Sequence, residues 1–576
     1  MNLFVLPTLA AAGPALRMAK HMTSNMVVPA EAPTFTGWAS APGKAVTARA
    51  STGQTASASS DNTSAFTLVL PARPASLEAF SVNVSEAGGA TMTLSNLLAG
   101  DVWVCSGQSN MEFSIAEMFG AEQVIREAGQ LPGLRLFAVQ KNASAAGEEA
   151  DLIEAQYAEG WVDATTETVC GAAHSRTAAR FCEPHCGPSA VVSSFKRDTW
   201  GFFSAACYVH GLQLLRATGR PQGLLETCWG GTPIEAWSSP VALAKCNGDG
   251  DGDKPATPSE PQEEDTELGE AATSGPSSLW NSMVAPLLGL PIRGALWYQG
   301  EANARNGNKY ACQLRAMIGD WRTRFAALPP PDAERSGGQG QGAASPFVFT
   351  TVQIAASGGD GTLRLAQAAS LSLPRTALAV TTDLYDAHSP CGSVHTRHKN
   401  ETGIRAARAS LAIGYGHTSL AWRGPVPRTI KAGQGGEVSV VFDAAGALAF
   451  ASVPNQTTVP ADQNFEATSD TSLVSGWKRV PATVLAALPL GSNDGAAAAA
   501  ADTVRVDASS LGAAVAGLRF NWPSVPLGQQ LYDGGGREAG LPAGPFLARC
   551  GGGVAGECEL VVGGEVPVGG VVVEEA

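Results

Sequence analysis

The chain has 576 residues, several times the ~150 usual for one domain, so we expect more than one domain and at least one large buried core. Lys and Arg number 38 against 52 Asp and Glu, and the net charge of −14 argues against nucleic acid as a partner. No stretch reaches the ~20 consecutive apolar residues of a membrane helix, because Pro7 and Pro14 interrupt the longest candidate.

The N-terminus, the glycosylation motifs and the cysteines favour the secretory route. We interpret residues 1–22 as a leader peptide with an apolar run and three alanines at 10–12, although Asn2 leaves its first segment without a positive charge. Eleven cysteines fit an oxidising compartment, with Cys550 and Cys558 as a local disulfide pair and at least one free thiol. Acceptor motifs for N-glycosylation, or simply surface asparagines, occur at Asn62, Asn83, Asn142, Asn400 and Asn455.

Short strands dominate the first hundred residues. Clusters of Pro, Gly and Ser separate strand-like runs. The expected strands are residues 27–28, 34–38, 45–50, 65–70 and 90–94. We interpret residues 23–98 as an N-terminal β domain that resembles half of a β-sandwich.

From residue 99 the predicted strands and helices alternate, which is typical of a parallel sheet covered by helices on both faces. Expected strands are residues 102–105, 223–227, 294–298, 347–353 and 378–383, and expected helices are residues 111–128, 203–218, 310–326 and 401–415. The acidic, Pro-rich segment 247–276 is predicted to be a solvated insert. Short strands return after residue 424, so a C-terminal β region is expected over residues 424–576.

The motif GQSNM, residues 107–111, is the strongest chemical signal. It follows the apolar strand 102–105 and precedes a predicted helix. Ser109 would therefore stand at the carboxyl edge of the sheet, where open α/β folds build their sites. A helix N-terminus there offers N–H groups to a developing oxyanion. The alternative is that Ser109 only caps the helix.

Three further segments supply the other parts needed for acyl transfer. WGGTPIEAW at residues 229–237 and WYQGEAN at residues 297–303 place glycines and amides at the ends of strands. TTDLYDAHSPCGSVHTRHK at residues 381–399 supplies carboxylates and imidazoles. Together with Ser109 they offer a nucleophile, a general base and oxyanion donors.

These four motifs, in this order, resemble the sialate O-acetylesterase family, carbohydrate esterases of the SGNH-hydrolase superfamily. The resemblance runs from residues 21–43 through 310–322 to 518–546, and it excludes inserts near 140–195 and 247–276. It implies an α/β fold: a three-layer, flavodoxin-like SGNH-hydrolase parallel sheet over residues 99–423, flanked by β-sandwich-like regions.

The resemblance also implies a role for individual residues. Ser109 would be the nucleophile, and His395 would take its proton and return it to the departing sugar hydroxyl. The N–H groups of Ser109 and Gly231 and the side-chain amide of Asn303 would hold the oxyanion, where one donor is typically worth ~3 kcal/mol. The resemblance implies neither a cofactor nor a metal.

The acidic member of the triad stays open. SGNH hydrolases usually place Asp three residues before the histidine, where this chain has Gly392. Asp386 is our first candidate and Asp383 the second, and neither residue is the third possibility.

Several other residues near the motifs could have more than one role. His388 and His398 compete with His395 as the base or are exposed loop histidines. Gln108, Gln299 and Glu301 bind substrate or brace the loops. The residues of a Cys- and His-rich insert fit disulfides, free thiols or a zinc site. They are Cys170, His174, Cys182, His185 and Cys186.

We therefore expect a secreted or lysosomal serine esterase that removes O-acetyl groups from sugars, with sialic acids as the first candidate. Two alternatives remain. The site could act on acetylated xylan or another polysaccharide, because the motifs specify the acyl chemistry better than the alcohol. The chain could also be an inactive carbohydrate-binding relative.

Overall fold

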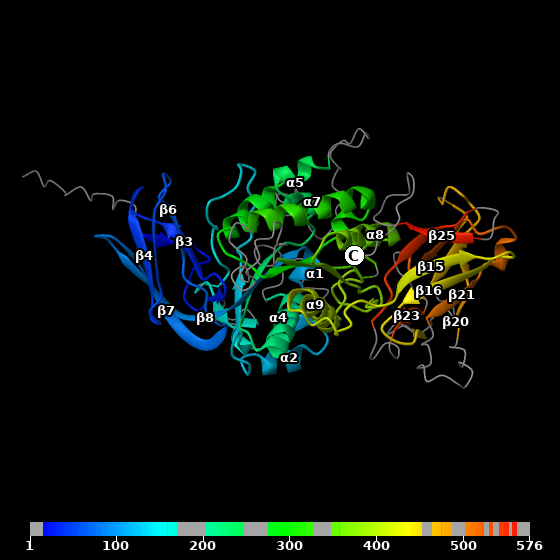
Figure 1. Cartoon of the computed structure of the whole chain (residues 1–576), viewed down its shortest axis with the longest axis horizontal. Helices are drawn as coiled ribbons and strands as arrows, with labels where there is room; N and C mark the ends of the chain where they lie inside the picture. Colours follow the sequence, from blue (N-terminus) through cyan, green and yellow to red (C-terminus); the bar gives the residue numbers. More distant parts are fainter. Residues whose placement is uncertain are drawn as a thin grey trace, which may run out of the picture.

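The structure is a computed structural model. It describes residues 15–157, 159–169, 203–246, 275–325, 347–355, 357–451, 464–473, 475–485, 502–523, 529–533, 541–551 and 556–561. The acidic insert at 247–274 and the Cys- and His-rich segment at 170–186 lie outside these residues, as do residues 1–14. The protein is mixed α/β, as predicted, and elongated in chain order. An N-terminal β region, a central α/β body and a C-terminal β region follow one another from left to right in Figure 1.

The central sheet is parallel except at one edge. Its strand order is β10-β9-β11-β8-β12-β13-β14, and only the β10–β9 pair is antiparallel. Strand β8 lies between β11 and β12, so the chain builds outward from it in both directions. The carboxyl end of β8 is therefore the topological switch point, where ligands bind in open α/β sheets. The strands are β8 (Thr91–Gly107), β9 (Leu134–Ala138), β10 (Val162–Asp163), β11 (Gln222–Cys228), β12 (Gly294–Tyr298), β13 (Val348–Val352) and β14 (Thr376–Ala379).

Helices cover both faces of this sheet. In Figure 1, α5 (Pro240–Ala244), α7 (Gly307–Phe325) and α8 (Gly361–Ala368) lie above it, and α4 (Ala205–Thr218) and α9 (Lys399–Gly414) lie below. The predicted apolar stripe of α7 is buried and packs into the larger core cluster with Trp297 and Phe349. Its members are Tyr310, Leu314, Met317, Ile318, Trp321 and Phe325, all at most 3% exposed.

The predicted single helix over residues 111–128 is wrong. The chain instead forms α1 (Ser109–Glu112), the 3-10 helix η1 (Ile115–Glu117), α2 (Ala121–Glu127) and the turns between them. Backbone N–H groups that a continuous helix would use internally donate to other segments: Ile115 N to Phe203 O at 3.2 Å and Phe119 N to Arg397 O at 2.9 Å. Gly120 has a left-handed φ of 77°, which ends any helical continuity before α2.

The N-terminal region is continuous with the central sheet. Strand β8 spans both, so the predicted domain boundary at residues 98–99 falls inside a strand. Its first half pairs with β7 (Ser76–Glu86), which pairs with β4 (Ala45–Ala50) and through it with β5 (Thr55–Ser59). β2 (Val27–Pro29) runs parallel to β8. A separate sheet contains β1 (Arg17–Met18), β3 (Thr34–Trp38) and β6 (Ala65–Val69), so residues 15–22 of the predicted leader contribute a strand.

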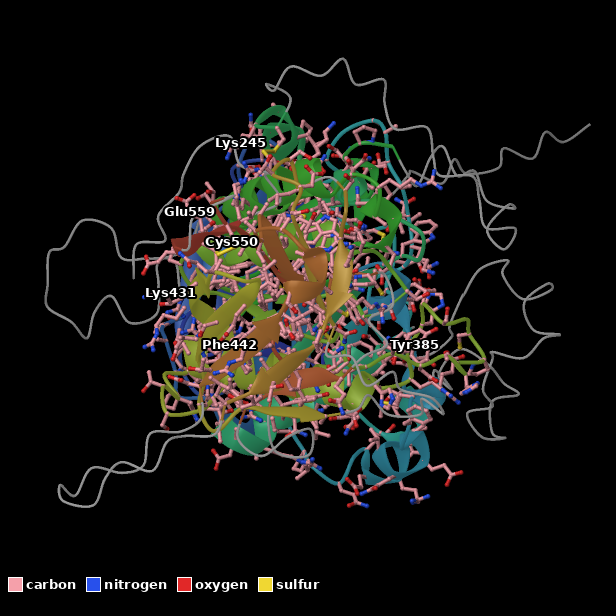
Figure 2. The ribbon with its side chains drawn as sticks, turned by 90° about the vertical axis from the view of Figure 1, so that its right-hand side faces the viewer. Lys245, Tyr385, Lys431, Phe442, Cys550 and Glu559 are labelled. Carbon is pink, nitrogen blue, oxygen red and sulfur yellow. A yellow bond between two sulfur atoms is a disulfide. The ribbon has the colours of Figure 1, made fainter. Side chains whose placement is uncertain are left out.

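A nine-stranded antiparallel sheet forms most of the C-terminal region, which faces the viewer in Figure 2. Its order is β19-β18-β22-β24-β25-β15-β16-β21-β20, and β17 (Ala449–Ala451) pairs separately with β23 (Gln530–Tyr532). The strands are β15 (Val426–Ala432), β16 (Glu437–Asp443), β18 (Phe465–Thr468), β19 (Lys478–Val480), β20 (Ala482–Val484), β21 (Thr503–Asp507), β22 (Gly517–Phe520), β24 (Phe546–Arg549) and β25 (Gly556–Val561).

Disulfides connect several of these elements. The predicted pair Cys550–Cys558 is confirmed, and Cys246 is bonded to Cys312 in α7. The Cys105–Cys207 bond joins β8, just before the GQSNM motif, to the first turn of α4. Among the described residues, none of the helices combines the length and the hydropathy needed to cross a membrane.

Candidate active site

A sharp strand-to-helix turn presents Ser109 at the carboxyl end of β8. Gly107 has a φ of 145°, and a Cβ on it would lie 2.1 Å from the carbonyl oxygen of Tyr298 in β12. Gln108 N donates to the same carbonyl oxygen at 3.1 Å. Only glycine permits this close approach of the two strands, and the turn leaves the Ser109 side chain half-buried at the sheet edge.

His395 reaches this serine from the loop between β14 and α9; Tyr385, near the start of that loop, is labelled in Figure 2. Nε2 of His395 lies 2.8 Å from Ser109 Oγ, and Nδ1 lies 2.7 Å from the carbonyl oxygen of Cys391. A carbonyl oxygen only accepts, so Nδ1 carries the proton and Nε2 is free to accept one from the serine. Cys391 is itself disulfide-bonded.

The imidazole of His395 is held in its neutral form. Burial lowers its pKa to about 4; the positive charge of Lys399 acts in the same direction, while the bond to Cys391 and the charge of Glu112 oppose it. At any pH well above 4, His395 is therefore a base ready to take the serine proton.

The two acidic candidates lie in ion pairs with arginines. Arg397 donates to both oxygens of Asp386, at 2.6 and 3.0 Å, and Arg405 donates to both oxygens of Asp383, at 2.6 and 2.7 Å. Burial alone would raise the pKa of the Asp386 carboxyl, but the bonds and charge of Arg397 outweigh it and lower that pKa.

The structure thus does not bring either carboxylate to the imidazole. The Cys391 carbonyl stands where the predicted acid would accept from Nδ1 of His395. A guanidinium has the fork geometry that matches a carboxylate, and Arg397 contacts both oxygens of Asp386 in this way. Asp386 instead fixes the two ends of the histidine loop, through Arg397 and through the backbone N–H of His388.

Among the described residues, no hydrogen bond joins either competing histidine to Ser109. His388 is exposed. His398 is buried, with its ring against Phe119 and its Nδ1 3.7 Å from a carboxylate oxygen of Glu401. Within the described part of the chain, His395 is the histidine that hydrogen-bonds Ser109.

The glycine turn after β11 lies against Ser109. A Cβ on Gly230 would lie 3.4 Å from the Cβ of Ser109, and Trp229 N donates to Gly107 O at 3.1 Å. Gly231 follows with a left-handed φ of 72°. The carboxylate of Glu112 in α1 accepts from Gly230 N at 2.8 Å, which ties the turn to the helix of Ser109.

Asn303 is buried beside the same turn. Its Oδ1 accepts from Ile234 N at 2.9 Å, and its Nδ2 donates to Glu235 Oε2 at 2.8 Å. These bonds fix the orientation of the side-chain amide, which has a second N–H to offer.

The predicted substrate-binding residues act as braces in this structure. Gln108 and Gln299 are 3% and 0% exposed, and Gln299 Nε2 donates to Gln108 Oε1 at 3.0 Å. Glu301 Oε1 accepts from Asn110 Nδ2 at 2.6 Å. These bonds connect the GQSNM turn to the WYQGEAN turn, so the geometry favours the second of the two readings of these residues.

Sequence reasoning missed three polar residues that hold the site together: Asn110, Glu112 and Lys399. Asn110 belongs to the GQSNM motif, and its position directly after Ser109 could have indicated a role in the site. Lys399 ends the segment 381–399, but neither it nor Glu112 showed in the sequence which contacts it makes, because these reach segments more than a hundred residues away in the chain.

A cavity of about 490 Å³ lies between residues 116–123 and the histidine loop, which contributes Pro390 and Arg397. Its wall combines apolar side chains with charged ones. Phe119 is 36% exposed and has the guanidinium of Arg397 4.3 Å from its ring centre.

No protein-family model matches the chain. Sialate O-acetylesterases do: the orangutan (Pongo abelii) protein is 30% identical over 358 residues, 59% of this chain and 58% of that protein, so this match spans less than two thirds of the relative. The human protein is 29% identical over 446 residues, 73% of this chain and 75% of that protein.

A solved structure agrees with these relatives. A carbohydrate acetylesterase from Xanthomonas citri superposes with a TM-score of 0.68 at 25% identity, covering 92% of this chain and 99% of that one. Its fold therefore extends over the N-terminal and C-terminal β regions as well as the central body. The resemblance predicted from the motifs is confirmed: the chain is similar to sialate O-acetylesterases and, over nearly its whole length, to a carbohydrate acetylesterase.

Proposed function

We propose that the protein is a serine esterase that removes O-acetyl groups from acetylated sugars, with sialic acids as the first substrate class. The observation that carries this proposal is the 2.8 Å contact between Ser109 Oγ and His395 Nε2 at the switch point of a parallel sheet. The names of the relatives and of the structural neighbour support the same chemistry.

The mechanism follows from the hydrogen bonds of the pair. Nε2 of His395 takes the serine proton as Ser109 Oγ attacks the acetyl carbonyl, and the C–O bond to the sugar then breaks as the imidazolium returns the proton to the sugar oxygen. Water repeats the sequence on acetyl-Ser109 and releases acetate. Cys391 O, rather than a carboxylate, keeps the imidazole in the required tautomer.

The oxyanion donors in this proposal are the N–H groups of Ser109 and Gly231 and the second N–H of Asn303 Nδ2. The left-handed φ of Gly231 and the fixed amide of Asn303 support the assignment. Donors set in place beforehand need no reorganisation during the reaction.

In this proposal the sugar extends from Ser109 toward the cavity beside the histidine loop, whose lining does not include Ser109 or His395 themselves. Phe119 offers part of a ring face to a pyranose, and Gln123 and Arg126 offer hydrogen-bond donors. Because Gln108 and Gln299 are buried and bonded to each other, they shape the site from behind instead of touching the sugar.

A polysaccharide acetylesterase is the second candidate function. The structural neighbour is named only as a carbohydrate acetylesterase, and the acyl half of the site does not select the alcohol.

We further propose an oxidising compartment, secreted or lysosomal, and a division of the chain into an N-terminal β domain, an esterase domain and a C-terminal β region. The disulfides Cys105–Cys207, Cys246–Cys312 and Cys550–Cys558 support the compartment, since such bonds are rare in reducing cytosol. The separate core cluster of the C-terminal sheet supports the division there.

The test is hydrolysis of an aryl acetate, 9-O-acetylsialic acid and acetylated xylan by the wild type and by Ser109→Ala. We expect the variant to fold normally and to lose at least ~10³-fold in kcat. Near-normal turnover by the variant would refute the serine mechanism, and acetate release from xylan but not from the sialic acid would favour the second candidate.

A further inference from the structure

Lys399 is a fully buried lysine at the start of α9, four residues after His395. Its Nζ donates to Asn110 Oδ1 at 2.5 Å. The ammonium also lies 4.6 Å from the ring centre of Phe113 and 5.2 Å from that of Tyr298, both within cation–π range. Burying a lysine costs free energy, so a lysine enclosed by Asn110, Phe113 and Tyr298 is a candidate for a specific role.

Asn110 connects three loops of the site. It follows Ser109 directly, and its Nδ2 donates to Val394 O at 3.0 Å and to Glu301 Oε1 at 2.6 Å. Val394 is the residue before His395. One buried carboxamide therefore joins the helix of the nucleophile to the loop of the base and to the turn after β12.

The direction of that carboxamide is set by its partners. A lysine ammonium only donates and a carbonyl oxygen only accepts, so Lys399 holds Oδ1 and Val394 O holds Nδ2. If the lysine were replaced by an apolar side chain, Oδ1 would be buried without its donor and the amide would no longer have a preferred orientation from that side.

The charge of Lys399 also acts on the base. Burial lowers the pKa of Lys399 to about 7, although Glu301, Asp386 and Glu117 raise it, so the amine is protonated at acidic pH. The groups that act on His395 are Lys399, which disfavours the imidazolium, and Glu112 and the Cys391 carbonyl, which favour it.

We propose that Lys399 is a positioning residue of this esterase site: it orients the Asn110 carboxamide that aligns Ser109 with His395, and its ammonium keeps positive charge off the imidazole at acidic pH. This inference rests on the proposed function. Its consequence is an enzyme whose base stays neutral, and whose activity persists, at a lower pH than an unperturbed histidine allows.

The test is the pH dependence of kcat/KM on an aryl acetate for Lys399→Met. Without the ammonium, His395 keeps its proton to higher pH. The acid limb of the profile, the pH range in which kcat/KM falls as the solution becomes more acidic, should therefore move upward by roughly half a pH unit or more, the order expected for one partly buried charge pair. The control is Lys431→Met, in an exposed ion pair with Glu557 on the C-terminal sheet, which should leave the limb unchanged.

A loss of packing alone would lower kcat/KM at every pH without moving the limb, and a folded Lys399→Met with the wild-type limb overturns the proposal. If this variant does not fold, Lys399→Gln is the second test: its amide can still donate to Asn110 Oδ1 but carries no charge, so the limb should again move upward, and an unmoved limb overturns the proposal. Wild-type activity in Ser109→Ala would instead refute the proposed function itself.

Discussion

The carboxylate of Glu112 offers a way to perturb the glycine turn after β11, which the proposed mechanism uses for oxyanion binding, without replacing Ser109 or His395. It accepts from Gly230 N at 2.8 Å and pairs with the ammonium of Lys141, and both side chains are at most 11% exposed. Glu112→Ala leaves Gly230 N–H and the lysine without this partner. A hydrogen bond to a charged group contributes ~1.5–3 kcal/mol, and one oxyanion donor ~3 kcal/mol.

If Glu112 aims the N–H of Gly231 through Gly230, the variant should lose ~10- to 100-fold in kcat/KM on an aryl acetate at pH 7. Glu112→Gln keeps an acceptor of the same shape and should lose much less. Glu557→Ala, at an exposed ion pair far along the chain, is the matched control. A Glu112→Ala protein with wild-type thermal stability and kcat/KM within about twofold of the wild type would refute this reasoning.

Three further predictions concern the base, the core and the sugar. The wild-type kcat/KM should hold from neutral pH down and fall only near the pKa of His395, about 4, because the neutral imidazole is the base; an acid limb near 6.5 contradicts this. Replacing Cys105 and Cys207 by alanine opens a link across 102 residues and should lower Tm by several degrees in calorimetry, since loops of ~100 residues are stabilised by up to ~4.7 kcal/mol; an unchanged Tm contradicts it. Phe119→Ala should raise KM for an acetylated sugar and leave aryl acetate kinetics unchanged, so an equal change in both would argue against a sugar in the cavity.

The strand-to-helix turn around Ser109 could be predicted because its signals are local. The apolar run before it, the glycine that permits the turn and the polar residues after it are adjacent in the sequence. The same holds for strands β3, β4 and β12, whose bounds agree with the expected ranges because turn residues flank them.

The failed prediction of one helix over residues 111–128 has a tertiary cause. The sequence shows a helix-compatible composition, but the donors of Ile115 and Phe119 are used by distant carbonyl groups. The local sequence pattern cannot reveal that these N–H groups bond outside a helix, since this depends on where residues 203 and 397 lie in the folded chain.

The acid of the triad could not be assigned from spacing for a similar reason. Asp386 is close to His395 in sequence and fully buried, as expected of a catalytic carboxylate. Only the folded loop reveals that Arg397 takes both of its oxygens and that the Cys391 carbonyl meets Nδ1 of the imidazole. The burial of Lys399 could not be predicted either, because lysine is normally exposed and its partners Asn110, Phe113 and Tyr298 come from two elements, α1 with the residue after it and β12, that lie far from it in the chain.

Labelling with a fluorophosphonate tests the central claim, a nucleophilic Ser109 activated by His395, most directly. Peptide mass spectrometry of the treated wild type should locate one stoichiometric adduct on Ser109, with loss of esterase activity in parallel, and His395→Ala should react far more slowly. Full inactivation with the adduct on another serine, or an active enzyme whose Ser109 stays unlabelled, would contradict the account.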